Sequence, residues 1–376
     1  DVKIKKKIKH SKNSYPSGES SKYLNEYLSQ MFVNQSKSKT FHLSTKIFLQ
    51  FNKWTDHEME SKIYKTLIFP LRSIYFLMDY VKYFFLKLKL FKSLRNSIQN
   101  KKKPNSFLEK KISEYNPDLI VLPTKAIDNY YFDLNKIALK LNIKLIYLVD
   151  NWDNISGKSI VFKNHYYGVW GKQSLQQVKK IHGVSLKKIR IVGSPRFEVY
   201  FQQKNAKIKS HYSFKYILFL ENTYCKESIS LKYLDKIINN NKIFNKFKIV
   251  YRPHPWRKSR EIIKARDYKN VVIDKQLRKT YDKKFFLDKS QPDLKYYPSL
   301  ISNAQLVISG PTTMVIESLL LKKKILLLAF KESNSFYSPH YMLKYLEHFK
   351  GINKFKNLVI NKNLNSLEKD LIKTYL

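Results

Sequence analysis

Short, nearly continuous apolar runs, separated by segments of helical periodicity, dominate the chain from about residue 116 onward. Buried parallel strands have this character, because helices cover both faces of a parallel sheet. The first series of predicted strands comprises Leu119–Leu122, Leu145–Val149, Tyr166–Trp170 and Ile189–Val192. The helices expected among them are Ser106–Tyr115, Leu134–Leu141 and Lys172–His182, the last ended by Gly183 at its C′ position.

A second alternating series follows the polar, lysine-rich segment Phe201–Phe214, which we interpret as a linker. Its predicted strands are Tyr216–Leu220, Lys248–Tyr251, Val271–Ile273, Leu306–Ile308 and Ile325–Phe330. One helix is expected over Glu227–Asn240, with one apolar face formed by Leu231, Leu234, Ile237 and Ile238. Another is expected from Pro311 to about Lys323. Two such series predict an α/β fold with a ligand cleft, since open parallel sheets bind ligands beyond the carboxyl ends of their strands.

The first hundred residues have a different character. Residues 1–40 are polar and lack a sustained period, apart from a short helix expected around Ser21–Met31. From about residue 58 to 103 the pattern is helical, aromatic and basic. The most apolar stretch, Leu67–Phe91, is interrupted by five charged residues. We therefore expect no membrane span and no signal peptide.

A chain of 376 residues is long enough for two domains. We predict an N-terminal domain of residues 1–205, which contains the basic helical insertion, and a C-terminal domain of residues 206–376. The single cysteine, Cys225, excludes a disulfide scaffold and a cysteine-based zinc site. It favours a reducing compartment, most simply the cytoplasm.

The chain is strongly basic, with 72 Lys and Arg against 29 Asp and Glu and a net charge of +43. Three interpretations stay open, namely a lysine-rich background from biased codon use, attraction to an anionic membrane surface, and nucleic-acid binding. The even spread of lysines favours the first. Glycine is more informative, because only 8 occur and five of them lie between Gly157 and Gly193, with Gly310 standing alone. Such glycines indicate positions where the backbone needs positive φ or a close approach.

The sharpest chemical feature is the segment LVISGPTTMVIE, in which an apolar strand ends at Ser309 and Gly310 and a helix is expected from Pro311. Free main-chain N–H groups and the positive end of the helix dipole at such a start suit a phosphate. Ser309, Thr313 and Glu317 recur every four residues, so they form one stripe. The hydroxyls suit a diphosphate and the carboxylate suits ribose hydroxyls. The alternative is a plain helix cap with a solvated glutamate.

Two further strands end in candidate binding residues. One delivers Arg252 and His254 in a loop that flanking prolines make rigid. Arginine binds phosphate oxygens in a bidentate manner, and imidazole acts as a hydrogen-bond donor or an acid. The other ends in Gly193, Ser194 and Arg196, where main-chain donors and a guanidinium suit an anion. The alternatives are a histidine packed in a rigid turn and a hinge without ligand contact.

Carboxylates also follow a strand of the first domain, at Asp150 and Asp153. Either is a candidate base that deprotonates an acceptor hydroxyl, and a helix cap is the alternative. The patterns GxxxxGK[ST], GxGxxG and HExxH do not occur, which weakens P-loop, dinucleotide and zinc-protease hypotheses. The histidines are scattered without ligand spacing, so no metal is expected.

In this order, the motifs VDNWDN, VGSPRF, RPHP and SGPTTMVIE resemble the GT-B superfamily of nucleotide-sugar glycosyltransferases, which includes the fold of UDP-N-acetylglucosamine 2-epimerases. The resemblance covers roughly residues 116–330. It points to bacterial proteins of surface-polysaccharide assembly, such as capsule and O-antigen, including the CDP-glycerol glycerophosphotransferase-like group. It implies two Rossmann-like domains whose parallel sheets face each other across a cleft. Two departures are Lys322-Lys323-Lys324 where the family has Gly-Lys-Pro, and no evident opening strand and glycine loop before residue 40.

The resemblance also implies residue roles, with the second domain holding the nucleotide donor. It implies that Arg252 and His254 lie near the diphosphate and that Glu317 meets the ribose. The residues implied to bind the diphosphate are Ser309, Gly310, Thr312 and Thr313. Gly193 and Ser194 match a glycine turn before the chain crosses between domains.

We therefore expect a cytoplasmic glycosyltransferase, peripheral on the inner face of the plasma membrane if its insertion binds anionic lipid. It would move a sugar from a nucleotide-diphosphate donor to a surface polysaccharide or polyprenyl-linked glycan, with no cofactor and no specific nucleic-acid partner. Asp153 is the candidate base, and His254 and Arg252 are expected to stabilise the departing diphosphate. The alternatives are a CDP-polyol phosphotransferase, a UDP-sugar 2-epimerase and a basic nucleic-acid-binding protein.

Overall fold

The computed structural model describes residues 103–123, 129–149, 151–157, 165–202, 209–222, 227–254, 263–277, 295–332 and 338–376. The helix expected at Ser21–Met31, nearly all of the basic insertion and the middle of the expected linker lie outside these ranges. The described chain divides into two compact units, and the change from one to the other falls between Gly193 and Ser194.

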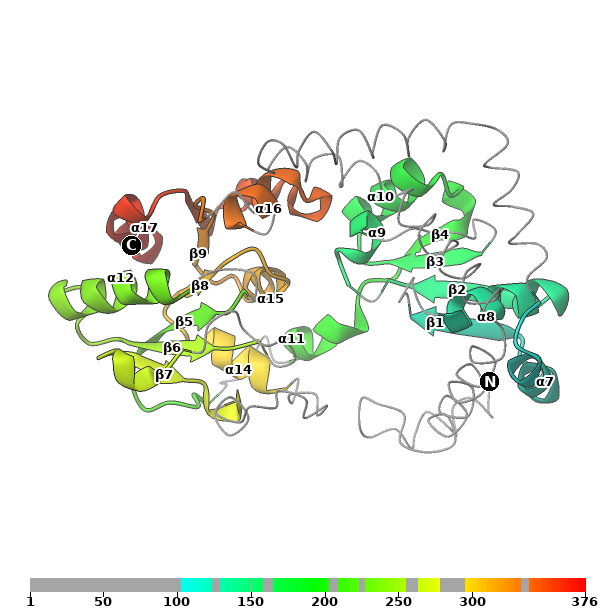
Figure 1. Ribbon diagram of the computed structural model, residues 1–376, viewed down its shortest axis with the longest axis horizontal. Coiled ribbons are helices and arrows are strands. Elements are labelled where there is room, and N and C mark those ends of the chain that lie inside the picture. The colour runs from blue at the N-terminus through cyan, green and yellow to red at the C-terminus, as the bar shows by residue number, and fades with distance from the viewer. Residues whose placement is uncertain are drawn as a thin grey trace, which may run out of the picture. The chain divides into compact units, whose positions relative to one another are not determined.

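In the first unit, four parallel strands form one sheet in the order β1-β2-β3-β4 (Figure 1). The strands are β1 (Leu119–Pro123), β2 (Lys144–Leu148), β3 (Tyr166–Val169) and β4 (Ile189–Ile191). The helices are α7 (Ser106–Tyr115), α8 (Asn129–Lys140), α9 (Asn154–Gly157) and α10 (Lys172–His182), with a short 3-10 helix η1 (Leu186–Lys188) before β4. The four predicted strands are confirmed.

Aromatic packing holds the interior of this sheet. Tyr147 and Tyr167 are fully buried on neighbouring strands, and their rings stack with centroids 5.1 Å apart. Val178 of α10 is also fully buried in the same cluster. Helix α10 ends as predicted, because Gly183 adopts the left-handed φ of 66° and donates its main-chain N–H to the last turn.

In the second unit, six parallel strands are ordered β10-β9-β8-β5-β6-β7 (Figure 1). The strands are β5 (Tyr216–Leu220), β6 (Lys248–Arg252), β7 (Val271–Ile273), β8 (Val307–Ser309), β9 (Ile325–Leu328) and β10 (Leu358–Asn361). The helices are α11 (Glu198–Gln202), α12 (Glu227–Asn240), α14 (Tyr296–Ser302), α15 (Met314–Leu320), α16 (Pro339–Tyr345) and α17 (Leu367–Tyr375). Short 3-10 helices are η2 (Pro195–Phe197), η3 (Ala265–Asp267), η4 (Glu347–Phe349), η5 (Ile352–Lys354) and η6 (Leu364–Ser366).

This strand order is the doubly wound, Rossmann-type order. The chain starts at β5 in the middle, runs outward through β6 to β7, and returns to the other side of β5 at β8. The order therefore reverses between β5 and β8. Together with the parallel sheet of the first unit, it confirms the predicted α/β class with two parallel sheets.

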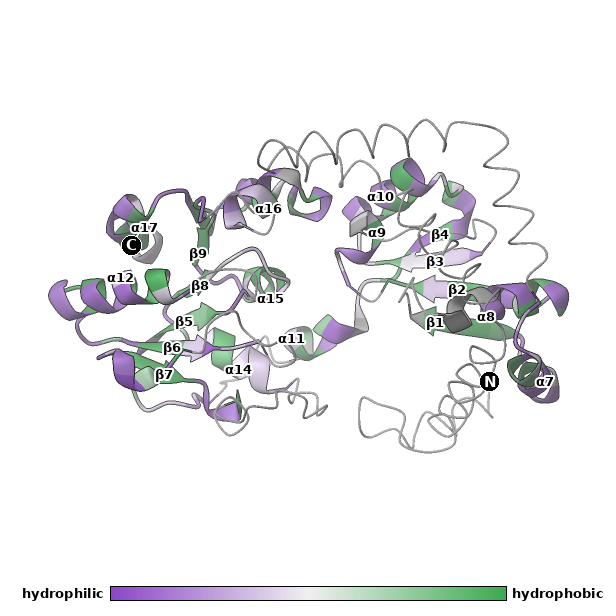
Figure 2. Cartoon of the chain, viewed as in Figure 1, coloured by the Kyte–Doolittle hydropathy of each residue, from purple (hydrophilic) through white to green (hydrophobic). Residues whose placement is uncertain are grey.

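The core of the second unit forms where the apolar runs predicted it. The strands β5, β8 and β9 are green in Figure 2, and every residue of β5 is buried. Helix α12 has its predicted bounds and buries its predicted face, formed by Leu231, Leu234, Ile237 and Ile238. Strand β10 and helices α14, α16 and α17 were not predicted, because each is short, with four to nine residues, and offers few positions on which to read a period.

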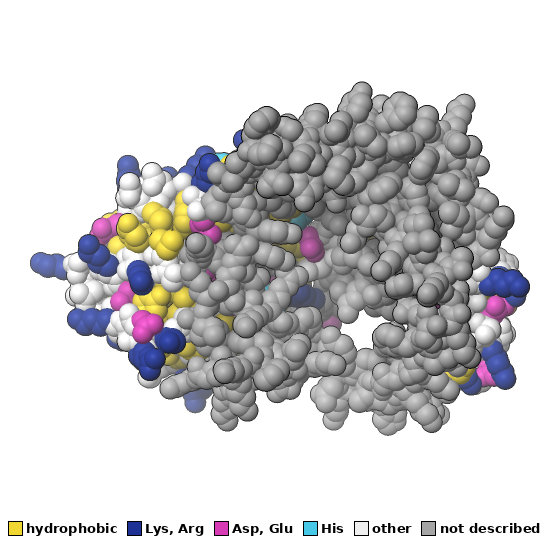
Figure 3. Space-filling view, viewed as in Figure 1, with side chains coloured by type: hydrophobic (Ala, Val, Ile, Leu, Met, Phe, Trp, Pro, Cys, Tyr) yellow, Lys and Arg dark blue, Asp and Glu magenta, His cyan; other side chains and the backbone are white. Residues whose placement is uncertain are grey.

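Figure 3 shows the charged side chains of the described residues on one face of the molecule. On the face in Figure 3, Lys and Arg are interspersed with Asp, Glu and apolar side chains. Among the helices in the described ranges, none is long and apolar enough to cross a membrane.

The helix predicted from Pro311 to Lys323 is shorter at both ends. It begins at Met314, because the residues before it form a bend, and it ends at Leu320. Lys322 then adopts a left-handed φ of 54°, which is unusual for a residue with a side chain. This is the position at which the resembling family has glycine. Lys322 therefore adopts a left-handed backbone conformation that glycine adopts without steric cost.

We predict that Lys322→Gly raises the free energy of unfolding by about 0.5–1 kcal/mol, because glycine adopts positive φ without steric cost. The matched control is Lys236→Gly, in the interior of α12, which should lower it by about 1 kcal/mol. Urea denaturation measures both. If Lys322→Gly lowered the free energy of unfolding as Lys236→Gly does, the expected relief of backbone strain at Lys322 would be contradicted.

Candidate functional site

The residues predicted to bind a ligand in the second unit end neighbouring strands of the six-stranded sheet. Leu220 of β5 pairs in register with Arg252 of β6 on one side and with Ser309 of β8 on the other. The loops after these three strands therefore start at one edge. They carry Asn222, His254 and Thr312. Because the strand order reverses between β5 and β8, this edge is where an open α/β sheet has its crevice.

The turn after β8 exposes main-chain donors. Ser309 is fully buried, and its hydroxyl donates to the carbonyl oxygen of Gly310 at 2.8 Å and lies 3.3 Å from the Thr312 hydroxyl. Thr312 and Thr313 are half-exposed. Their main-chain N–H groups make no hydrogen bond to any residue in the described ranges. The amide donors expected for a phosphate therefore belong to the turn, and not to a helix beginning at Pro311.

Glycine is required at position 310, because the turn after β8 passes very close to Asn222 in the loop after β5. A Cβ atom on Gly310 would lie 2.9 Å from the Cβ of Asn222 and 3.0 Å from the Asn222 amide nitrogen. That nitrogen donates to the carbonyl oxygen of Pro311 at 3.2 Å and lies 3.9 Å from the sulfur of Met342. Asn222, which is 3% exposed, thus ties the loop after β5 to the turn after β8.

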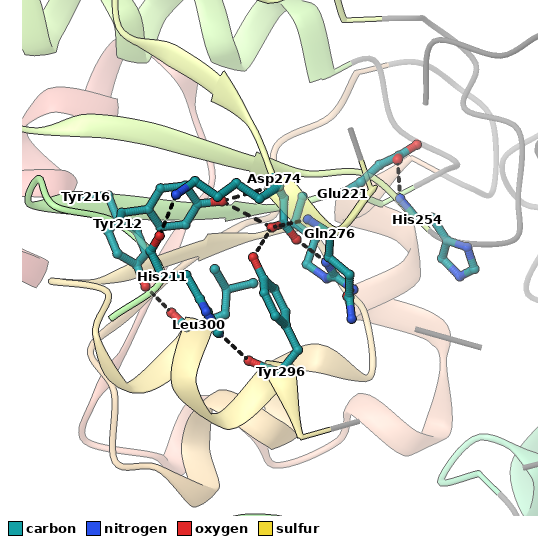
Figure 4. A network of polar contacts seen from close by, with 11 residues as sticks. His211, Tyr212, Tyr216, Glu221, His254, Asp274, Gln276, Tyr296 and Leu300 are labelled. Carbon is teal, nitrogen blue, oxygen red and sulfur yellow. Dashed lines mark hydrogen bonds and ion pairs between the residues drawn. The ribbon is translucent and has the colours of Figure 1, made fainter. Parts of the chain in front are cut away.

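Two buried glutamates hold the loops after β5 and β6. Glu227 accepts the main-chain N–H of Asn222 and, at 3.0 Å, the hydroxyl of Tyr251. Burial, together with the nearby Glu221, raises the pKa of Glu227 well above its ordinary value. Glu221 accepts the main-chain N–H of His254. The histidine loop is therefore fixed through its backbone, and Figure 4 shows its ring pointing away from Glu221.

Arg252 is buried and belongs to a polar network around Asp274, whose members Asp274, Gln276 and Tyr296 are labelled in Figure 4. Its guanidinium donates to Asp274, which is fully buried at the end of β7, and at 2.9 Å to the amide oxygen of Gln276. It also lies 4.3 Å from the ring centre of Tyr297. The guanidinium predicted to bind phosphate is thus directed at protein groups, and it fixes the carboxyl end of β6.

Tyrosine hydroxyls complete this network around Asp274. Tyr296 donates to it at 2.6 Å and Tyr212 at 3.1 Å, and His211 stacks on the Tyr296 ring with centroids 3.9 Å apart. Burial, with the adjacent Asp274, raises the pKa of Tyr212 to about 12 and also raises the pKa of Tyr296. Both hydroxyls therefore stay protonated donors at neutral pH.

Glu317 on α15 is 1% exposed and has protein partners at both carboxylate oxygens. Nη2 of Arg196 donates to one oxygen at 2.6 Å, and the hydroxyl of Tyr200 donates to the other. Burial acts to lower the pKa of Arg196, but Glu317 raises it overall. Burial and the same carboxylate raise the pKa of Tyr200. Arg196 and Glu317 therefore form an ion pair, and the neutral Tyr200 donates a hydrogen bond to it. Glu317 and Tyr200 are buried, whereas Arg196 is half-exposed.

In the first unit, Asp153 and Gly193 are described, and Asp150 lies outside the described residues. Asp153 lies before α9, and its carbonyl oxygen accepts the Ser156 hydroxyl at 3.2 Å. Its Oδ1 atom is buried and has no hydrogen-bond partner in the described chain. Gly193 has a φ of 74° and Ser194 is half-exposed, so a turn follows β4 as predicted from its glycine.

Several residues of the site were not singled out in the sequence. They are Tyr200, Glu221, Asn222, Glu227, Asp274, Tyr296 and Tyr297. Glu221 and Asn222 follow the apolar run of β5, so their place after a buried strand was a usable signal. Asp274 likewise follows β7. Within the described residues, no group of three or more His, Cys, Asp or Glu could hold a metal ion.

Comparison with known proteins finds similarity in solved structures only. No protein-family model matches the chain, and no curated protein sequence matches it. Similar structures include the UDP-GlcNAc 2-epimerase of Methanocaldococcus jannaschii in complex with UDP-GlcNAc and UDP, at 15% identity and a TM-score of 0.40, covering 71% of this chain and 72% of that one. The MnaA–UDP structure of S. aureus has 13% identity and a TM-score of 0.46, covering 71% and 69%. The Neisseria meningitidis UDP-GlcNAc 2-epimerase bound to UDP-GlcNAc has 12% identity and a TM-score of 0.40, covering 72% and 79%. The fold assignment rests on the sheet order itself.

We predict that Gly310→Ala lowers the free energy of unfolding by about 1–3 kcal/mol, because the added methyl group collides with Asn222. The cost should shrink in the Asn222→Gly background, where nothing remains to collide with. Gly171→Ala is the control, since its Cβ would meet nothing within 4 Å. Equal costs of Gly310→Ala in both backgrounds, measured by urea denaturation, would rule out this contact as the cause.

Proposed function

We propose that the chain is a glycosyltransferase that binds a nucleotide-diphosphate sugar at the carboxyl edge of β5, β6 and β8. The observation that carries this proposal is the turn after β8. Its two half-exposed threonines, Thr312 and Thr313, offer main-chain N–H groups that no residue in the described ranges accepts. The turn stands beside the strand reversal, where open α/β sheets bind nucleotides.

The chemistry of sugar transfer explains what these donors do. An acceptor hydroxyl attacks the anomeric carbon, the bond from that carbon to the diphosphate oxygen breaks, and the hydroxyl proton passes to a base. The negative charge that develops on the departing diphosphate must be balanced by groups already in place. Amide N–H groups of the turn and the half-buried His254 supply such balance. The motifs VDNWDN, VGSPRF, RPHP and SGPTTMVIE occur in the order that resembles nucleotide-sugar glycosyltransferases, and this resemblance supports a nucleotide sugar as the donor.

Arg252 has a supporting role in this proposal. Its guanidinium is paired with Asp274 and Gln276, so it holds the end of β6 and thereby the loop that carries His254. Asp153 is the proposed base for the acceptor hydroxyl. Its buried, unpaired Oδ1 atom is an acceptor in need of a hydrogen-bond donor. The proposed acceptor is a glycan hydroxyl, on a surface polysaccharide or a polyprenyl-linked chain.

A thermal-shift screen tests the donor class directly, since a ligand that binds the folded chain raises its melting temperature. The panel comprises UDP-, GDP-, CDP- and CMP-linked sugars and a CDP-linked polyol. A rise with one nucleoside-diphosphate sugar supports the proposal. A response to the CDP-polyol alone would replace sugar transfer by polyol-phosphate transfer, and no response to any compound would overturn nucleotide binding.

We predict that His254→Ala lowers kcat by 10²-fold or more, within the range for removing an acid from a transferase site. The melting temperature should stay close to that of the wild type, because the substitution keeps the main-chain N–H that donates to Glu221. His340→Ala, on α16, is the matched control and should leave kcat unchanged. Wild-type turnover in His254→Ala would remove the histidine from the mechanism.

A further inference from the structure

The carboxylate of Glu317 and the guanidinium of Arg196 come from distant parts of the chain. Arg196 lies in η2 at the start of the second unit, and Glu317 lies in α15 behind the turn after β8. Their 2.6 Å contact and the hydroxyl of Tyr200 fill both oxygens of the carboxylate. A ribose therefore has no exposed oxygen of Glu317 to bind, since the side chain is 2% exposed.

The arginine of this pair is the accessible member. Its side chain is 37% exposed, and a single nitrogen, Nη2, is bound to Glu317. The other guanidinium donors, on Nε and Nη1, make no hydrogen bond to residues of the described chain. The guanidinium is thus fixed through Nη2 and keeps N–H donors on Nε and Nη1. Such a group is suited to bidentate binding of a phosphate.

Helix geometry sets this guanidinium beside the turn that carries the free amides. Thr313 and Glu317 are four residues apart at the start of α15, so their side chains lie on one face. A group bound to Glu317 thus lies one helical turn from Thr313. The guanidinium of Arg196, bound to Glu317, therefore lies by the face of α15 at whose N-terminal end Thr313 and its turn stand.

We propose that the guanidinium of Arg196 binds a phosphate in a bidentate manner, and we call this guanidinium the fork. Glu317 and Tyr200 are positioning residues that hold it. This inference rests on the proposed function, because the phosphate belongs to the donor nucleotide. It changes the role of Glu317 from a ribose contact to an orienting carboxylate. The same chemistry also fits free pyrophosphate, which carries no ribose and serves as the discriminating probe.

The test measures dissociation constants of the full chain for inorganic pyrophosphate and for the nucleoside diphosphate of the donor found by the thermal-shift screen. Arg196→Gln should weaken both ligands by about 10- to 100-fold, the range for losing a hydrogen bond to a charged group. Tyr200→Phe and Glu317→Gln should weaken both ligands in parallel, since they act through the arginine. A ribose contact at Glu317 would weaken the nucleotide alone and overturn the proposal.

A double-mutant cycle separates positioning from direct contact. In the Arg196→Gln background, Tyr200→Phe should have no further effect on either constant, because there is no guanidinium left to orient. Additive losses would overturn the positioning role. Arg196→Lys should recover less than a tenth of the lost affinity, since lysine keeps the charge without the planar fork.

Two control variants change residues of the same types at exposed positions away from the proposed site. Tyr233→Phe alters a tyrosine on the exposed side of α12, and Arg266→Gln alters an arginine that is 80% exposed. Both should bind like the wild type. If Glu317→Gln fails to fold, Tyr200→Phe alone decides the matter, because it removes one hydroxyl and keeps the ring.

The outcomes distinguish this inference from the function on which it rests. Binding of neither ligand by the wild type would refute the nucleotide site itself. Wild-type binding of the nucleotide with unchanged constants in Arg196→Gln would refute the fork and leave the nucleotide site standing. Binding of the nucleotide without any binding of pyrophosphate would also refute the fork, since it must recognise phosphate alone.

Discussion

The pairing of β5 with β6 on one side and with β8 on the other is the constraint on which the second unit depends. It puts the first strand of the unit in the middle of the sheet and lets the chain wind outward in both directions. The loops that follow β5 and β8 therefore diverge from a shared edge. Asn222 and Gly310 show how closely the two loops approach before they part, since not even a methyl group fits between them.

Two arginine–carboxylate pairs determine the geometry around this edge, one buried at both members and one with a buried carboxylate and a half-exposed arginine. Arg252 joins β6 to β7 through Asp274, and Arg196 joins the first residues of the unit to α15 through Glu317. Such pairs add little net stability, because desolvation offsets their attraction, but they strongly disfavour any arrangement that separates them. In a chain with 29 acidic residues against 72 basic ones, the few buried acids are thus used to fix loops.

The sequence predicted the strands well, since a buried parallel strand leaves a local signature of consecutive apolar residues. It also placed residues 252, 254 and 309–313 at the ends of predicted strands, and the structure shows that these strands share an edge. It could not predict the partners of Arg252 or Glu317, because Asp274 and Tyr200 are distant in sequence and carry no pattern of their own. The helical stripe alone suggested a Glu317 open to a ribose, with a solvated glutamate as the alternative, and only tertiary packing shows it enclosed. The start of α15 was misplaced because Pro311 is typical of a first helical turn, whereas here it lies in a bend.

The contacts of residues 194–202 bear on where the second unit can be cut from the chain. A fragment that started at the predicted boundary, residue 206, would lack both partners of Glu317 and leave an uncompensated charge inside the protein. A buried carboxylate left without its partners destabilises a folded domain, because its charge stays out of water and unpaired. An autonomous C-terminal fragment therefore has to include Arg196 and Tyr200.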